Sequence, residues 1–138
     1  MDIIYFMKKI IFVLLIALSS PSHADWDLIY KDTQKKTEYF LNLADTVSQK
    51  EKIRAWTLES FSQPEKAGSL EYLSVKSFVE FDCQASKLRI LAYSLYGSNM
   101  GKGKTIFSKG SPMEWAVIND NTVYSAYSQI VCAESISD

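Results

Sequence analysis

The sequence predicts an α+β fold in which an antiparallel β-sheet of about six strands is backed by a C-terminal amphipathic helix, with one disulfide. Apolar and polar residues alternate over 70–83, a period typical of a strand covered on one side. Near the C-terminus apolar residues instead recur every three or four positions, the spacing of an amphipathic helix. The chain has two cysteines, enough for one bond between sheet and helix.

The first 24 residues have the character of a secretory signal peptide. Two lysines precede the apolar run 10–18, and Ser22 and Ala24 are small residues at the cleavage spacing. This run is far shorter than the roughly 20 residues that span a bilayer, so we expect cleavage after Ala24 and no permanent membrane span. No cysteine directly follows the run, so we expect export, to the periplasm or cell surface, without a lipid anchor. Residues 25–138 then form a single domain.

Short aromatic and aliphatic runs predict the first three strands, over residues 26–30, 39–43 and 52–61. The segment 63–68 contains a proline and a glycine, which favour a turn or loop. We therefore expect the third strand to end near Phe61.

Two central strands are predicted over 70–83 and 87–96, paired as a hairpin through 84–86. In the first strand, Leu73, Val75, Val79, Phe81 and Cys83 share the inner face, and Tyr72, Ser74, Lys76, Phe78, Glu80 and Asp82 share the outer face. Alternate charges on an outer face are usually solvated, so we expect water around Glu80 and Asp82. The second strand repeats the pattern, with Leu88, Ile90 and Ala92 opposite Arg89, Leu91 and Tyr93.

The remaining elements follow a flexible point at 97–103. Two further strands are predicted over 104–107 and 114–118, and polar residues at 119–122 can cap a helix that begins at Val123. Cysteines of an exported chain usually pair because the compartment is oxidising. We therefore predict a Cys83–Cys132 bond that ties the last turn of the helix to the sheet.

Composition argues against several classes of function. The formal net charge is −1, so no basic excess exists to hold a nucleic acid. The single histidine, His23, lies in the predicted signal peptide, and with both cysteines paired no base stands beside a nucleophile. Residues 97–105 resemble a phosphate-binding loop, but five residues instead of four separate the glycines. We expect no catalytic residue, no metal site and no cofactor.

Aromatic residues give the more promising signal. Tyr72, Phe78, Tyr93, Tyr96, Tyr124 and Tyr127 exceed what a small core is expected to hold, and tyrosine is favoured where an apolar ring must face a partner. The alternative is that these rings simply cover the sheet. The candidate binding residues are Lys76, Lys87, Arg89 and Tyr93.

An ordered set of motifs covers the C-terminal two thirds of the predicted domain: residues 74–83, 93–103, Trp115 and 122–133. Together they resemble the surface-adhesin protein E family, which comprises small exported proteins of Gram-negative bacteria. The resemblance implies an antiparallel sheet backed by a C-terminal helix, a disulfide and a tendency to dimerise. It also implies binding of host matrix or plasma proteins at the bacterial surface, with Lys76 matching the family's basic character.

Two functions are therefore predicted. The first is a non-enzymatic protein that binds a host or envelope protein through its sheet surface. The second is a periplasmic inhibitor or envelope-stress protein of the lysozyme-inhibitor kind, which would share the size, export signal and single disulfide. Protease shaving of intact cells separates them, because only a surface protein is removed.

Overall fold

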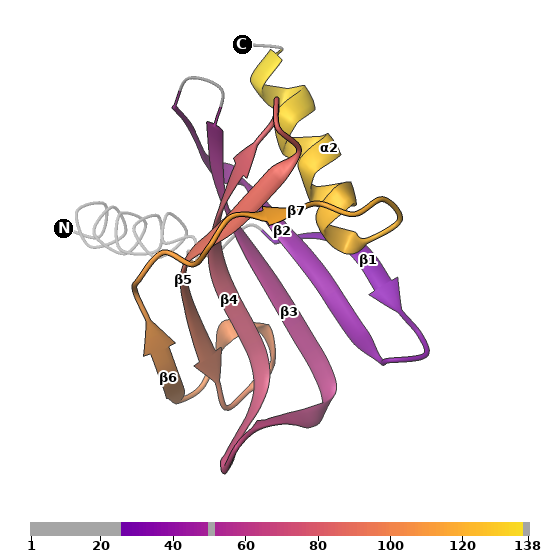
Figure 1. Cartoon of the computed structure of the whole chain (residues 1–138). Helices are drawn as coiled ribbons and strands as arrows, with labels where there is room; N and C mark the ends of the chain where they lie inside the picture. Colours follow the sequence, from indigo (N-terminus) through magenta and orange to yellow (C-terminus); the bar gives the residue numbers. More distant parts are fainter. Residues whose placement is uncertain (1–25, 50–51, 137–138) are drawn as a thin grey trace, which may run out of the picture.

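The computed structural model describes residues 26–49 and 52–136. The predicted signal peptide, residues 1–24, lies outside the described residues. Within them, seven strands form one sheet, followed by one α-helix (Figure 1). The elements are β1 (Asp27–Asp32), β2 (Thr37–Gln49), β3 (Lys52–Ala67), β4 (Leu70–Asp82), β5 (Lys87–Tyr96), the short 3₁₀ helix η1 (Asn99–Gly101), β6 (Thr105–Lys109), β7 (Ala116–Val117) and α2 (Val123–Ile136).

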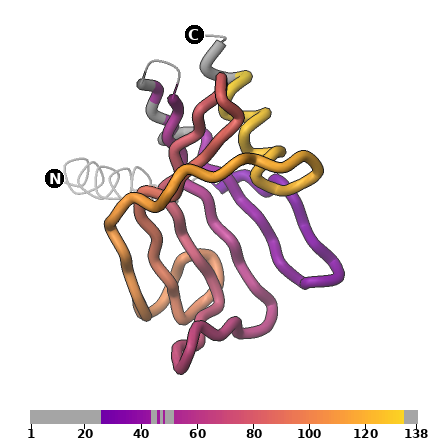
Figure 2. The backbone as a smooth tube through the Cα atoms, viewed as in Figure 1, coloured from indigo at the N-terminus to yellow at the C-terminus, as the bar shows by residue number. Residues whose placement is uncertain are grey.

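The sheet is an antiparallel meander. Its strand order follows the chain from β1 to β6, and β7 pairs with β5 beside β6. The backbone in Figure 2 runs back and forth through neighbouring strands before it enters the helix. The predicted antiparallel sheet of about six strands with a C-terminal helix is confirmed. The strand expected over 114–118 is shorter, because only Ala116 and Val117 pair with β5.

Two tight turns use the same side-chain chemistry. Asp32 Oδ1 accepts the N–H groups of the residues two and three positions later, at 3.0 and 2.9 Å. Asp82 Oδ1 does the same after β4, at 3.2 and 3.0 Å. Each turn then closes on a residue with positive φ, Lys36 at 53° and Ser86 at 51°. Both hairpins are thus set by an aspartate that satisfies the backbone of its own turn.

The β3–β4 hairpin extends further than expected. The segment 63–68 is not a loop: β3 continues to Ala67, and the reversal occurs at Gly68, whose φ is 63°. Pro64 is accommodated because the pairing with β4 is interrupted between Ser60 and Glu65. A proline that cannot donate to the ladder is tolerated at such an irregularity.

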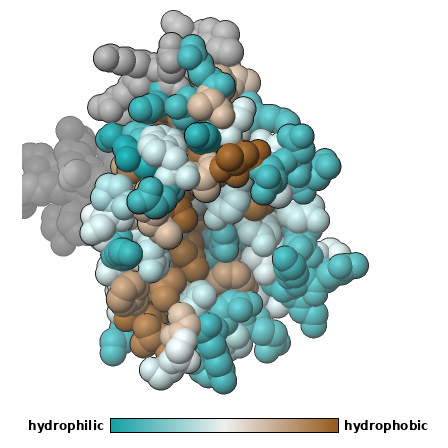
Figure 3. All heavy atoms as spheres, viewed as in Figure 1, coloured by the Kyte–Doolittle hydropathy of each residue, from teal (hydrophilic) through white to brown (hydrophobic). Residues whose placement is uncertain are grey.

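The core lies between α2 and the upper part of the sheet. Leu41, Ile53, Val79 and Phe81 are fully buried against Tyr127 of the helix, together with Ala55, Leu88 and Val131. Thr122 Oγ1 accepts the N–H of Ser125 at 3.2 Å, which caps the helix as predicted. The Cys83–Cys132 disulfide is confirmed, and it joins the β4–β5 turn to the helix. Outside the core, hydrophilic residues cover the β1–β2 hairpin and hydrophobic residues gather over β5 and β6 (Figure 3).

Two of the tyrosines expected at the surface are instead packed beneath the helix. Tyr127 is completely buried, and its ring meets that of Tyr124 edge to face at 5.9 Å. Burial, and then the charge of Glu59, raise the pKa of Tyr124 to about 12. Burial also raises the pKa of Glu59, against an opposing hydrogen bond from Tyr124. These two rings therefore belong to the helix–sheet interface and leave the partner-binding role to other aromatics.

Candidate interaction surface

Alternate residues of β3, β4 and β5 form the face of the sheet opposite α2. Residues paired across antiparallel strands point to the same side, so the register places Trp56 beside Phe78, and Glu80 between Arg54 and Arg89. We call this surface the tryptophan face. It consists of Lys52, Arg54, Trp56, Lys76, Phe78, Glu80, Asp82, Lys87 and Arg89, with Trp26 and Trp115 against it.

A stacked aromatic pair lies at the centre of this face. The rings of Trp56 and Phe78 are 4.7 Å apart between centroids, with an interplanar angle of 26°. The ammonium of Lys76 lies 4.6 Å from the Trp56 ring and 6.0 Å from that of Trp26. All four side chains are half-buried. A cation over a ring and an offset stack each contribute about 0.5–1.5 kcal/mol, so the rings are held in place while still reaching solvent.

The next row of the face is a charged triad. Glu80 accepts a hydrogen bond from Arg54 Nε at 2.8 Å and from Arg89 Nε at 2.9 Å, and the Glu80 side chain is only 3% exposed. Burial alone would raise the pKa of Glu80, but the hydrogen bonds and charges of the two arginines outweigh it and hold that pKa below its ordinary value. Both guanidinium groups are thereby fixed over a buried carboxylate.

Trp115 extends the face beyond the triad. Its ring lies 4.6 Å from the Arg89 guanidinium carbon and 5.4 Å from Lys52 Nζ. It comes from the segment just before β7, which reaches the sheet because β7 pairs with the start of β5. All three tryptophans of the chain thus lie on one face, each with a cation close to its ring.

The structure brings together three of the four predicted binding residues. Lys76, Lys87 and Arg89 lie on the tryptophan face by register. Tyr93 does not, because the register shifts between Phe78 and Val79, whose partners are Ala92 and Ile90. The extra residue, Leu91, inverts the alternation along β5, so Tyr93 points to the helix side, where its ring lies 6.0 Å from Phe107.

The expectation that water surrounds Glu80 is wrong. Its residue exposure is 2%, because arginines on both neighbouring strands cover the carboxylate. Sequence reasoning also missed the tryptophans as a group. The signal that could have found them is alternation in two paired strands: Lys52, Arg54 and Trp56 share one face of β3, and Lys76, Phe78 and Glu80 share the same face of β4.

One end of the tryptophan face is covered by the loop that contains η1. Ser74 Oγ donates to the carbonyl of Ser98 at 2.6 Å and accepts the N–H of Gly101 at 2.9 Å. Ser60 Oγ accepts both the side-chain amide of Asn99, at 3.0 Å, and the N–H of Met100, at 3.2 Å. The segment expected to be flexible is therefore pinned to the sheet. The N–H groups of Met100 and Gly101 are bonded to serine hydroxyls, and those of Ser98 and Lys102 to backbone carbonyls, so these groups are not available to a phosphate.

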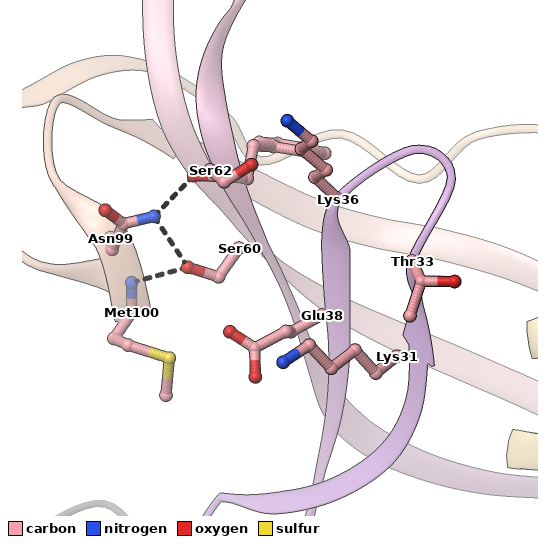
Figure 4. A pocket seen from close by; sticks show the side chains of 9 residues that line it. Lys31, Thr33, Lys36, Glu38, Ser60, Ser62, Asn99 and Met100 are labelled. Atoms are coloured by element: carbon pink, nitrogen blue, oxygen red, sulfur yellow. Dashed lines mark hydrogen bonds between the residues drawn. The ribbon is translucent and has the colours of Figure 1, made fainter.

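The η1 loop also requires a glycine at position 103. Its φ is 79°, and a Cβ there would come within 2.5 Å of Ser98 Oγ, so only glycine fits. Beside the loop lies an open cavity of about 460 Å³ (Figure 4). In that view Lys31 and Glu38 approach each other from β1 and β2, while Lys36 points away. The cavity is a candidate site for a small ligand, but its polar groups do not converge on one point.

The model of the family described as surface-adhesin protein E matches residues 26–133. The chain belongs to the surface-adhesin protein E family. The matched segment includes every strand of the described residues, the helix up to Ala133 and the whole tryptophan face.

Solved structures of a family member share the fold. Crystal form II of Haemophilus influenzae protein E is 12% identical with a TM-score of 0.62, covering 84% of this chain and 93% of that one. A second structure of the same protein gives 13% identity and a TM-score of 0.61, with coverage of 85% and 92%. Protein E from non-typeable Haemophilus influenzae gives 14% and 0.54, with coverage of 83% and 80%. At such low identities the likeness establishes the fold alone.

Among curated proteins the sequence has no significant match. Of the helices in the part of the chain that the structure describes, none has the length and apolarity to cross a membrane.

Proposed function

We propose that this protein is an exported, non-enzymatic binding protein that holds a protein partner through its tryptophan face. The observation that carries the proposal is the gathering of all three tryptophans, half-exposed and interleaved with cations, on the sheet face that α2 leaves uncovered. Family membership supports a surface adhesin. The partner class that we propose is a host matrix or plasma protein or an envelope protein. Residues 1–24 are proposed as the signal peptide and 25–138 as the exported domain.

The chemistry of the face suits protein recognition. Tryptophan and arginine are the residues that most often dominate the binding energy of interfaces, each costing about 2 kcal/mol or more when truncated in a desolvated centre. Here the rings are already fixed by stacking and by cations, and the arginines by Glu80. Side chains that are ordered before binding lose less entropy on binding.

The experiment compares the two faces of the sheet on the exported protein. Surface binding to immobilised matrix, plasma and envelope proteins is measured for Trp115→Ala, which removes a ring from the tryptophan face outside the strands. Tyr93→Ala, a ring on the helix side, is the matched control and also tests the sequence-based assignment of Tyr93. We expect the first variant to weaken binding about tenfold or more. Because Trp115 has two cation contacts, the variant should lose about 1–2 kcal/mol of stability and remain folded. If Tyr93→Ala loses binding while Trp115→Ala keeps it, the binding site lies on the helix side of the sheet.

Export and display are tested separately. N-terminal sequencing of the exported protein should begin at Asp25, and protease shaving of intact cells should remove a surface-displayed protein. A chain that keeps its first residues contradicts cleavage after Ala24. A protein that shaving spares, although it is cleaved after lysis, contradicts surface display. Neither result bears on the binding surface itself.

A further inference from the structure

The tryptophan face carries an excess of positive charge that the rest of the molecule does not share. Its cations are Lys52, Arg54, Lys76, Lys87 and Arg89, and its carboxylates are Glu80 and Asp82. The whole chain has a net charge of −1, so positive charge is concentrated on this face. A partner that meets it is favoured when it carries negative charge.

Both carboxylates of the face already accept hydrogen bonds within the protein. Glu80 is held beneath two arginines at 2.8 and 2.9 Å. Asp82 Oδ1 accepts two N–H groups of its own turn. A guanidinium has five N–H groups, and the bonds to Glu80 use the Nε of Arg54 and the Nε and Nη2 of Arg89. With side chains 32% and 29% exposed, both arginines keep donors for an incoming carboxylate.

Cationic and apolar rows alternate along the strands. Lys76, Phe78 and Glu80 are successive outward positions of β4, so the backbone positions of Lys76 and of the arginine pair flank the aromatic row. In this structure the Lys76 ammonium reaches back over the Trp56 ring, at 4.6 Å. Same-face residues of any extended chain are roughly 6.8 Å apart. The backbone positions of the two cationic rows are thus about as far apart as positions i and i+4 of an extended peptide, with position i+2 over the Trp56–Phe78 stack. Because the lysine stem is flexible, its ammonium can leave the Trp56 ring for a carboxylate at position i.

From this spacing we propose that the tryptophan face takes an extended segment of its partner with the pattern acidic–x–apolar–x–acidic. The inference rests on the proposed function and specifies its partner chemistry. One acidic side chain pairs with Lys76, the apolar one packs on the aromatic stack, and the second acidic one meets Arg54 and Arg89. A sulfated glycan fits less well, because its charged groups would also lie over the apolar row.

The test uses the exported protein and a fluorescein-labelled peptide, Gly-Ser-Asp-Ser-Leu-Ser-Asp-Ser-Gly, in a polarisation titration. Two matched peptides replace both Asp by Lys or the Leu by Ser, and a heparin hexasaccharide is the glycan probe. We expect the parent peptide to bind at least tenfold more tightly than either matched peptide. Its affinity should fall as salt rises from 50 to 500 mM, because exposed charges are screened.

Lys76→Gln and Lys109→Gln provide the protein-side comparison. Among the described residues, no hydrogen bond or ion pair joins Lys76 to the charged triad. Its replacement therefore leaves the triad intact. Lys109 pairs with Tyr93 on the helix side and is the control. Lys76→Gln should weaken peptide binding at least fivefold and Lys109→Gln should not.

The inference is overturned if the parent peptide fails to bind, if the lysine peptide or the glycan binds more tightly, or if both lysine variants behave alike. Failure of the acidic pattern and failure of the proposed function give different experimental results. If a partner protein is lost with Trp115→Ala but is indifferent to salt and to Lys76→Gln, the binding face stands and the acidic pattern falls. If Tyr93→Ala is the variant that loses the partner, the face itself is wrong.

Discussion

Replacing Glu80 by glutamine should destabilise the fold, although the residue belongs to a strand face that looks solvated in sequence. The glutamine side chain has one oxygen acceptor, which can serve one arginine. Its amide N–H₂ group then faces the guanidinium of the other arginine. A hydrogen bond to a charged group contributes about 1.5–3 kcal/mol, and breaking a buried pair costs about 3–5 kcal/mol. Since the arginines are 32% and 29% exposed, water can partly replace the lost contact. We expect a net cost of about 2–3 kcal/mol.

The assay is urea unfolding of wild type and Glu80→Gln at several pH values. The control is Glu71→Gln, because Glu71 pairs with Lys66 at 3.5 Å with both side chains more than half exposed. Such surface pairs contribute about 0–1 kcal/mol. At neutral pH the Glu80 variant should lose about 2–3 kcal/mol, equivalent to roughly 10 °C or more in Tm for a domain of this size, and the control almost nothing.

The pH dependence gives an independent check. The pKa of Glu80 is lowered from 4.5 in the folded protein, so the stabilising contribution of its charge is fully present above pH 4.5 and is lost as pH falls through the lower folded value. The difference between wild type and Glu80→Gln should therefore shrink below about pH 4. A difference under 0.5 kcal/mol at neutral pH, or one that is the same at pH 7 and pH 3, would refute the electrostatic account of the triad.

Three further predictions concern stability. Lys36→Gly should stabilise the fold by about 0.5–1 kcal/mol, because φ is 53° there and glycine adopts it without a Cβ clash; a lower Tm would contradict this. Reduction of the Cys83–Cys132 bond, which closes a separation of 49 residues, should cost about 4 kcal/mol on the chain-entropy model, measured by urea unfolding with and without reductant. Ser74→Ala should cost about 1–3 kcal/mol, because it removes two part-buried hydrogen bonds of about 0.5–1.5 kcal/mol each, and should speed amide hydrogen exchange in the η1 loop. Ser94→Ala, which removes only an exposed hydroxyl pair, should leave both stability and exchange unchanged.

The elements that sequence reasoning located correctly are those with sustained periodicity. The alternation over 70–83 predicted β4, and the three-to-four spacing after Val123 predicted α2. The hairpin order followed from short connections between strands. Extension of β3 to Ala67 was missed, because Pro64 and Gly68 are turn signals in isolation. In the structure the proline falls at a pairing irregularity, which only the partner strand reveals.

The candidate surface was only partly predictable, for two physical reasons. A single inserted residue, Leu91, inverts the face of everything after it on β5, and no local property of Leu91 marks it. Burial of Glu80 depends on Arg54, which lies 26 positions earlier and joins it only through the β3–β4 register. Lys76 and Arg89 were identified because basic residues on central strands are visible without register. The aromatic residues that lie beside them can be identified only once the register of the strands is known.

The helix that completes the core is synthesised after every strand of the sheet. Until α2 is present, Cys83 cannot find Cys132, and Leu41, Val79 and Phe81 lie on a sheet face open to water. A polypeptide cut short before Cys132 would therefore carry both an unpaired thiol and an exposed apolar face of the sheet. Such features mark an unfinished protein for chaperones and proteases. Oxidation of this one pair thus reports that α2 has been made and has packed on the sheet.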